Sequence, residues 1–126
     1  LTAIRSFDNR TFNHSANVCV LSVAAGRELG LDKKDLGRLG LAALLHDIGK
    51  LEIPRELLTR GHGITDSERQ VLEKHPLEGV KVLLRFQGLS DLSTRCAVVA
   101  FEHHLLRDGR GYHHVYYLWQ LGQVRQ

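Results

Sequence analysis

Five of the eight histidines stand beside apolar segments, at points where a helix is expected to end or break. They are His14, His46, His75, His103 and His104, and Asp47 directly follows His46. Neutral imidazole and carboxylate are both good ligands for hard or borderline divalent cations. Because an unpaired buried carboxylate is costly, Asp47 needs a cation or several hydrogen-bond donors close to it. These residues are therefore candidate metal ligands.

Each of these residues also has an ordinary explanation when it is taken alone. The His46–Asp47 pair suits a helix C-terminus, where a cationic histidine interacts favourably with the helix dipole, and His14 suits a partly exposed position in a first turn. Brought together in a bundle core, the same ligands suffice for two divalent ions bridged by a carboxylate. Ions roughly 3.5–4 Å apart clamp phosphoryl oxygens and activate water. Neither cysteine has useful ligand spacing, so a closed structural zinc site is not expected.

The apolar pattern that must position these side chains has the helical period of about 3.6 residues. We expect a first helix that is capped by Asn13 and ends at Gly30. A second helix is expected to start at Asp32 and to be stopped by Gly49. A short segment over residues 53–58 and a glycine-containing loop follow it.

Cap and break signals separate the helices of the second half. Thr65 and Glu68 have the pattern of a capping box. Pro76 predicts a kink or restart at His75, because proline lacks an amide hydrogen and disfavours a helical residue before it. A serine-capped helix then leads to the histidine pair, and residues 115–124 are expected to form a last amphipathic helix. The sequence predicts an all-α bundle of about five or six helices.

Length and composition indicate one ordinary globular domain. The chain has 126 residues, 43% of them hydrophobic, which suffices for a single core. Its net charge of +3 suits a compact anionic ligand at least as well as a polymer, and we expect no nucleic-acid polymer as partner. No apolar run reaches transmembrane length. Cys19 and Cys96 lie in apolar helical patterns, which favours a reduced, cytoplasmic protein. The chain opens on Leu1 and lacks methionine, so we expect a domain cut from a longer protein.

Three motifs, in this order, resemble the HD-GYP branch of the HD-domain phosphohydrolases. They are Leu-His-Asp-Ile-Gly-Lys at 45–50, His-Pro-Leu-Glu-Gly at 75–79, and the His-His pair followed by Asp-Gly-Arg-Gly-Tyr within 103–112. A His-Asp pair alone is shared by many hydrolases, whereas the ordered set is much more specific. The resemblance covers residues 13–112. It implies that 1–126 is a single HD-GYP-like domain of a multidomain bacterial signalling protein.

The resemblance implies an HD-domain helical bundle that holds two divalent ions, iron or manganese being frequent in the family. Such domains hydrolyse the second messenger cyclic di-GMP to linear pGpG or GMP through a metal-activated water. By matching position, Asp47 would bridge the metals, and Lys50 would lie near the phosphate or the attacking water as a second catalytic residue. The metal ligands implied are His14, His46, Asp47, His75, His103 and His104.

The substrate-binding residues come from Lys50 and from the signature loop. They are Lys50, Arg107, Gly109, Arg110, Gly111 and Tyr112. The two arginines would pair with the second phosphate or the guanine edges of the ligand. A solvated surface for the lysine and the arginines, and an ordinary tight turn for the glycines, remain alternatives.

The sequence departs from the family pattern at four places. Arg10 stands where members with a third metal have glutamate, which indicates two ions at most. Leu105 replaces the glutamate that usually follows the His-His pair, and His113 replaces the proline after Tyr112. No Asp or Glu follows Tyr112, although the family closes its site with an aspartate from a later helix. Without that aspartate one metal would be held more weakly.

These departures keep other functions open. A degenerate module of the same fold would bind nucleotide or a protein partner without turnover, and another HD-type enzyme would act on a different nucleotide. A purely structural helical bundle, which would bind no metal, is the remaining alternative. The partners that we expect for an HD-GYP-like domain are a cyclic dinucleotide or another nucleotide, together with regulatory domains or protein partners.

Overall fold

The computed structural model describes residues 9–60, 62–87, 90–108 and 111–112, and this part of the chain is helical. It contains six α-helices and one 3-10 helix. Their bounds are α2 Asn9–Glu28, α3 Lys33–Leu45, η1 Ile48–Glu52, α4 Arg55–Thr59, α5 Asp66–Leu72, α6 His75–Gln87 and α7 Asp91–Glu102. Extended pairing among the described residues is limited to an isolated bridge between Leu105 and Gly111. The predicted all-α class is confirmed.

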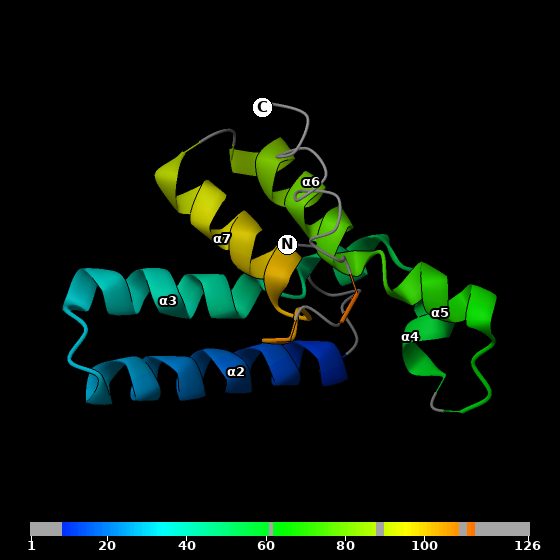
Figure 1. Ribbon diagram of the computed structural model, residues 1–126, viewed down its shortest axis with the longest axis horizontal. Coiled ribbons are helices and arrows are strands. Elements are labelled where there is room, and N and C mark those ends of the chain that lie inside the picture. Colours follow the sequence, from blue (N-terminus) through cyan, green and yellow to red (C-terminus); the bar gives the residue numbers. More distant parts are fainter. Residues whose placement is uncertain (1–8, 61, 88–89, 109–110, 113–126) are drawn as a thin grey trace.

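The first two helices form an antiparallel pair, α2 against α3 (Figure 1). Gly30 has φ +79° just beyond the end of α2, which is the left-handed position that glycine favours after a helix. Asp32 caps α3, and its carboxylate accepts a 2.8 Å hydrogen bond from the backbone N of Asp35. The expected cap at Asn13 is wrong, since α2 begins at Asn9. No glycine or proline separates residues 9–12 from the helix, so its hydrogen bonds continue through them.

The other helices build on this pair. Helix α7 packs on α3, while α6 packs on α7 and on η1 (Figure 1). The buried core lies where these elements meet and consists of Ala42, Leu83, Cys96, Ala97 and Ala100. Its alanines allow close approach of the helices. The short helices α4 and α5 contact each other at one side of the molecule.

The local signals of the second half are confirmed. Thr65 and Glu68 form a reciprocal capping box at the start of α5. Helix α5 ends before His75, and α6 starts at His75 as Pro76 requires. Ser90 caps α7. The helix expected over 115–124 lies outside the described residues.

Gly49 has a different role from the one predicted. Helix α3 ends at Leu45, and Gly49 lies inside η1, where it is buried. A Cβ at this position would collide with the carbonyl oxygen of His75 and the backbone N of Gly79. The missing side chain therefore lets η1 approach α6, and it does not serve to stop a helix.

Two features concern the described residues as a whole. Cys19 and Cys96 are both free thiols. A search of the described helices finds none that combines the length and the apolar character needed to cross a membrane.

The close approach at Gly49 predicts a stability difference between two glycine substitutions. Gly49→Ala is expected to lower the free energy of unfolding by about 1–3 kcal/mol, because the new methyl group overlaps backbone atoms of α6. Gly37→Ala is the matched control: nothing lies within 4 Å of its added Cβ, so better helix propensity should raise stability by up to about 1 kcal/mol. Denaturant unfolding of both variants measures the difference. Equal effects, or a neutral Gly49→Ala, would contradict this packing.

Candidate metal centre

The candidate metal ligands stand near helix ends, and their ligand atoms lie close together. His14 lies on the second turn of α2, His46 is the C-cap of α3, and Asp47 precedes η1. The remaining three stand at the first residue of α6 and directly after α7, and they are His75, His103 and His104. Residues that are far apart in the sequence thus form one cluster.

The side chain of Asp47 lies at the centre of this cluster and is only 2% exposed. Its Oδ1 lies 3.2 Å from Nε2 of His75 and 3.4 Å from Nε2 of His103. Its Oδ2 lies 3.2 Å from Nε2 of His46 and 3.8 Å from Nε2 of His14. Each carboxylate oxygen therefore faces its own pair of imidazole nitrogens.

Three of the histidines are oriented in the same way. The Nδ1 atoms of His46, His75 and His103 lie 2.7, 2.7 and 2.9 Å from the carbonyl oxygen three residues earlier. Because a carbonyl oxygen only accepts, Nδ1 carries the hydrogen and donates it. In the neutral ring, Nε2 is then left with a lone pair that points into the cluster. A backbone carbonyl on the other ring nitrogen is a common arrangement for histidines that bind a metal.

This arrangement places acceptor atoms against one another. Oδ1 of Asp47 is buried and has no hydrogen-bond partner among the described residues, and Nε2 of His75 lies 3.2 Å from Nε2 of His103. Neutral rings of this tautomer cannot donate to that oxygen. Protonating both rings would place two positive charges beside each other, which is unfavourable. A cation among these atoms would satisfy all of them, so the residues present fit a divalent metal.

The potential ligand atoms form two groups that share Asp47. One group contains Asp47, His75, His103 and His104, and the other contains His14, His46 and Asp47. Within each group the ligand atoms lie within 4.8 Å of one another. The His/Asp cluster is thus a possible metal site.

Charge and burial set the protonation of the cluster. Burial disfavours the Asp47 carboxylate, but the polar groups around it, among them the Lys50 ammonium in contact with Oδ2, outweigh this effect and hold the pKa of Asp47 well below its ordinary value. For His104, burial and then the nearby His103 and His75 lower the pKa to about 4. The carboxylate is therefore ionised and the His104 ring neutral near neutral pH, which are the forms that bind metals.

Gly111 and Tyr112 pack against His104. Gly111 pairs with Leu105 in an isolated antiparallel bridge and has φ +106°, with no room for a Cβ beside the carbonyl oxygen of His104. The Tyr112 ring lies 4.3 Å from the His104 ring, centroid to centroid, at an angle of 30°. Burial, followed by the charge of Asp47, raises the pKa of Tyr112 to about 12. Tyr112 is thus a neutral ring packed against a candidate ligand.

Lys50 belongs to the cluster and is not merely a surface residue. Its Nζ lies 2.6 Å from Oδ2 of Asp47, and its side chain is 26% exposed. Two pockets adjoin the cluster, and Lys50 lines both of them.

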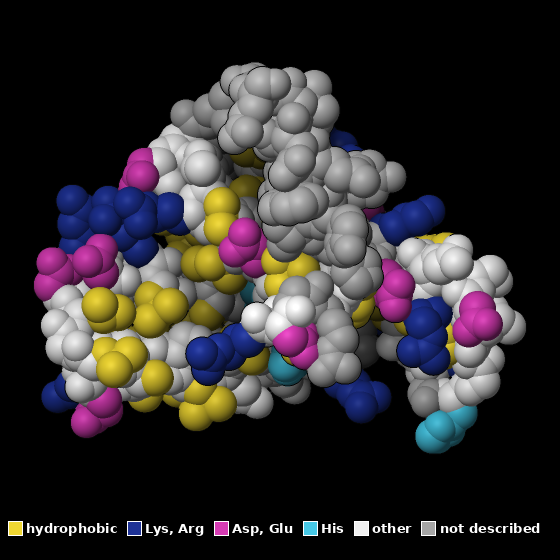
Figure 2. All heavy atoms as spheres, viewed as in Figure 1, with side chains coloured by type: hydrophobic (Ala, Val, Ile, Leu, Met, Phe, Trp, Pro, Cys, Tyr) yellow, Lys and Arg dark blue, Asp and Glu magenta, His cyan; other side chains and the backbone are white. Residues whose placement is uncertain are grey.

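The larger pocket, of about 530 Å³, opens beside the cluster toward α4 and α5. It is lined by Arg10, Thr11, His14, Lys50, Leu57, Leu58, Arg60, Ile64, Arg69, Leu72, Glu73, His75, His104 and Tyr112. A second pocket, of about 410 Å³, lies along α2, α3 and α7. It adjoins the same cluster of candidate ligands. Figure 2 shows Lys and Arg side chains on both sides of the junction between α2 and the α4–α5 pair.

The arginines that line the pocket differ from the ones that the motifs predict as substrate-binding residues. Arg107 is exposed and lines neither pocket, so its contact with substrate stays a prediction. Gly109 and Arg110 lie outside the described residues. Arg60 and Arg69 line the larger pocket but were missed, because they stand between the motifs. The capping box that starts α5 was the available signal, and it does not tell which way α5 faces.

Comparison with known proteins adds independent findings. The family model of the HD domain matches residues 3–114. A cyclic di-GMP phosphodiesterase of Pseudomonas aeruginosa is 37% identical over 112 residues, which is 89% of this chain and 26% of that protein. A cyclic di-GMP phosphodiesterase of Borreliella burgdorferi is 33% identical over 99 residues, covering 79% of this chain and 25% of that protein.

A related enzyme with another printed substrate is also similar. The 3'3'-cGAMP-specific phosphodiesterase 1 of Vibrio cholerae is 34% identical over 102 residues, which is 81% of this chain and 23% of that protein. The chain spans about a quarter of the length of these curated relatives.

The shared position of Asp47 predicts an order of metal loss. Asp47→Asn is expected to remove nearly all bound Mn²⁺, because Asp47 belongs to both ligand groups. His14→Ala should remove metal from one group, and His62→Ala, an exposed histidine outside both groups, should change nothing. Elemental analysis after dialysis measures the metal content. Equal content in all three variants would show that the cluster does not hold the ion.

Proposed function

Because this chain belongs to the HD-domain family, we propose that it is the catalytic domain of a metal-dependent phosphodiesterase that hydrolyses cyclic di-GMP to linear pGpG or GMP. The observation that carries the proposal is the buried Asp47 carboxylate, whose two oxygens face separate pairs of imidazole nitrogens beside a basic pocket. The names of the relatives, cyclic di-GMP and cGAMP phosphodiesterases, support the class of substrate. The motifs at 45–50, 75–79 and 103–112 support membership of the HD-GYP branch.

In this proposal the six candidate ligands hold two divalent ions, iron or manganese. They are His14, His46, Asp47, His75, His103 and His104. Bound ions of this kind activate water and stabilise negative charge on phosphoryl oxygens. Asp47 would contribute to holding both ions, and the separate histidines that face Oδ1 and Oδ2 support this role. The carbonyl contacts at Nδ1 of His46, His75 and His103 keep the rings in the orientation that binding requires.

Lys50 supplies positive charge at the boundary between the ligands and the pocket. Its ammonium group contacts Oδ2 of Asp47 at 2.6 Å and lines the larger pocket. A phosphate that enters from this pocket would meet the ammonium group beside the cluster. Such a preorganised charge stabilises the charge that develops on phosphate oxygens during hydrolysis.

The composition of the larger pocket supports a nucleotide. Its volume of about 530 Å³ falls in the range of small-molecule sites, about 300–1,000 Å³. Leu57, Leu58, Ile64 and Leu72 provide apolar surface for bases, and basic residues provide partners for phosphates. A cyclic dinucleotide combines both kinds of group.

Binding without turnover is the second candidate function. Asp47 is the only carboxylate in either ligand group among the described residues, so the negative charge available to two cations is small. A domain with this ligand set could bind nucleotide and signal through a partner. Regulatory domains within a longer protein, and a cytoplasmic location, stay predictions in either case.

The catalytic proposal predicts metal-dependent turnover. Protein loaded with Mn²⁺ or Fe²⁺ is expected to convert cyclic di-GMP to pGpG or GMP, as followed by chromatography of the nucleotides. Asp47→Ala should lower kcat/KM by more than the roughly 10–100-fold that loss of an outer-shell partner costs a metal site. His62→Ala should match the wild type, since His62 lines neither pocket.

The same assay separates the alternatives. Cleavage of 3'3'-cGAMP in preference to cyclic di-GMP would reassign the substrate. Metal-loaded wild-type protein that binds the dinucleotide without product would overturn the catalytic claim and favour the binding module.

A further inference from the structure

The larger pocket has walls of two different origins. One part comes from the candidate metal centre and includes His14, Lys50, His75 and His104. The other part comes from the start of α2, from α4, from α5 and from the connection between these two short helices. The motifs assign no role to this second part. Its basic members are Arg10, Arg60 and Arg69.

The pocket carries an excess of positive charge. Four basic residues line it, against Glu73 as the only acidic one among the described residues. Lys50 contacts Asp47 and Arg60 contacts Glu68, so these carboxylates and Glu73 offset most of the charge and one positive charge remains in excess. Apolar walls beside these charges strengthen their attraction for an anion, because field lines are focused in a cleft of low dielectric.

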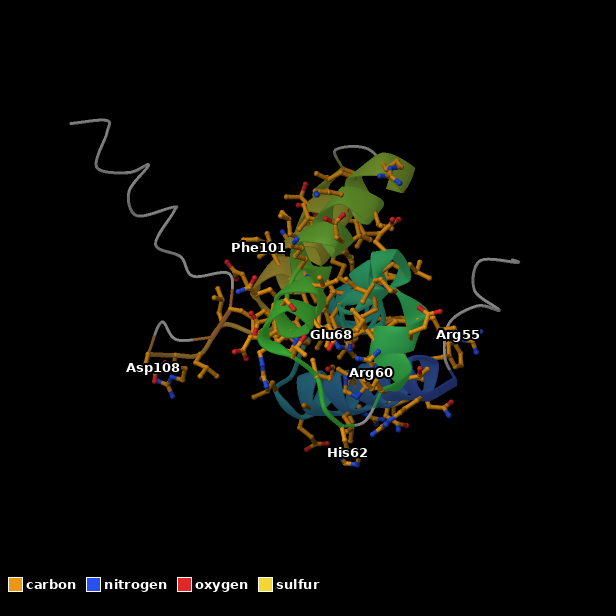
Figure 3. All side chains as sticks on the ribbon, turned by 90° about the vertical axis from the view of Figure 1, so that its right-hand side faces the viewer. Arg55, Arg60, His62, Glu68, Phe101 and Asp108 are labelled. Carbon is orange, nitrogen blue, oxygen red and sulfur yellow. The ribbon has the colours of Figure 1, made fainter. Side chains whose placement is uncertain are left out.

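Arg60 is held in place by the capping box of α5. Its guanidinium contacts Oε1 of Glu68, while Oε2 of Glu68 accepts a 3.0 Å hydrogen bond from the backbone N of Thr65. One contact leaves further N–H donors on the guanidinium for a ligand. Figure 3 shows Arg60 and Glu68 near each other toward the middle of the view, with Arg55 and His62 at the edge.

Arg69 follows Glu68 on α5 and lines the same pocket. It brings a second guanidinium without sharing the contact to Glu68. Arg60 is the C-cap of α4, and Arg69 lies in the last turn of α5. Because both stand on ordered helix ends, less freedom is lost when they bind a ligand. Guanidinium groups are well suited to phosphate oxygens through paired, charge-assisted hydrogen bonds.

We propose that Arg60 and Arg69, with Arg10 beside them, form a second anion subsite that binds the phosphate that is not being cleaved. The inference rests on the proposed function and names the substrate feature that the pocket selects. A cyclic dinucleotide has two phosphodiesters. When one lies at the metal centre, the other extends into the pocket toward α4 and α5. A substrate with a single phosphodiester gains nothing from this subsite.

The test compares substrates with one and two phosphates. Arg69→Gln is expected to raise KM for cyclic di-GMP roughly tenfold, as loss of a charge-assisted hydrogen bond predicts. Hydrolysis of bis(p-nitrophenyl) phosphate, which has one phosphodiester, should keep its wild-type rate, and metal content should not change. Arg60→Gln should likewise raise KM for cyclic di-GMP and leave hydrolysis of bis(p-nitrophenyl) phosphate unchanged. Thermal unfolding of this variant checks that loss of the Glu68 contact leaves the fold intact.

Arg27→Gln is the matched control. Arg27 lies in the last turn of α2 and does not line the pocket. It is 13 residues from His14 on the same helix, or about 20 Å along the axis. This variant should bind and cleave like the wild type.

Binding measurements keep the inference testable if turnover is absent. Titration of metal-loaded protein with a slowly cleaved phosphorothioate analogue of cyclic di-GMP should show roughly tenfold weaker binding for Arg69→Gln. The same loss in a protein without turnover would overturn the catalytic proposal but support the subsite. Unchanged affinity for the analogue, or equal losses with both substrates, would overturn the subsite and leave the catalytic proposal standing.

Discussion

The structure depends on the cost of burying one carboxylate. Asp47 is 2% exposed, and its Oδ1 has no hydrogen-bond partner among the described residues. An uncompensated buried charge costs several kcal/mol, roughly 3–5 when one partner of a buried pair is removed. The Lys50 ammonium, 2.6 Å from Oδ2, offsets part of this cost, whereas the Nε2 lone pairs of the surrounding imidazoles add to the need for positive charge. The cluster around Asp47 is therefore a possible metal site, because a bound cation would satisfy the carboxylate and the imidazole lone pairs together.

In this cluster, the contacts at helix ends pair the last carbonyl groups of the helices and also orient the imidazole rings. The last carbonyl groups of a helix have no partner within the helix. His46, His75 and His103 each donate Nδ1–H to such a carbonyl, three residues back. The contact satisfies the helix terminus and turns Nε2 toward Asp47. The helix C-terminus that explains His46 on its own is thus part of the same arrangement as the candidate metal site.

At the pocket, too, contacts that stabilise the fold also position candidate functional residues. The capping box that starts α5 also holds Arg60 through Glu68. Gly111, which pairs with Leu105, directly precedes Tyr112, whose ring packs against His104. Lys50 joins the two regions, since it contacts Asp47 and lines the pocket. Stabilising contacts and candidate functional contacts are here largely the same, so changes at the site will affect folding and binding together.

The local features are predictable from the order of residues. They include the all-α class, the cap of α3 at Asp32, the capping box at Thr65, the restart at His75, and the candidate ligands at helix ends. These follow from side-chain chemistry and helical period, which act over a few residues. How the helix ends converge depends on the tertiary structure. It gave Gly49 its role beside α6, brought Arg60 and Arg69 to the pocket, and left Arg107 away from it. Packing between segments that are distant in the sequence sets these positions, and the spacing of residues along the chain does not reveal that packing.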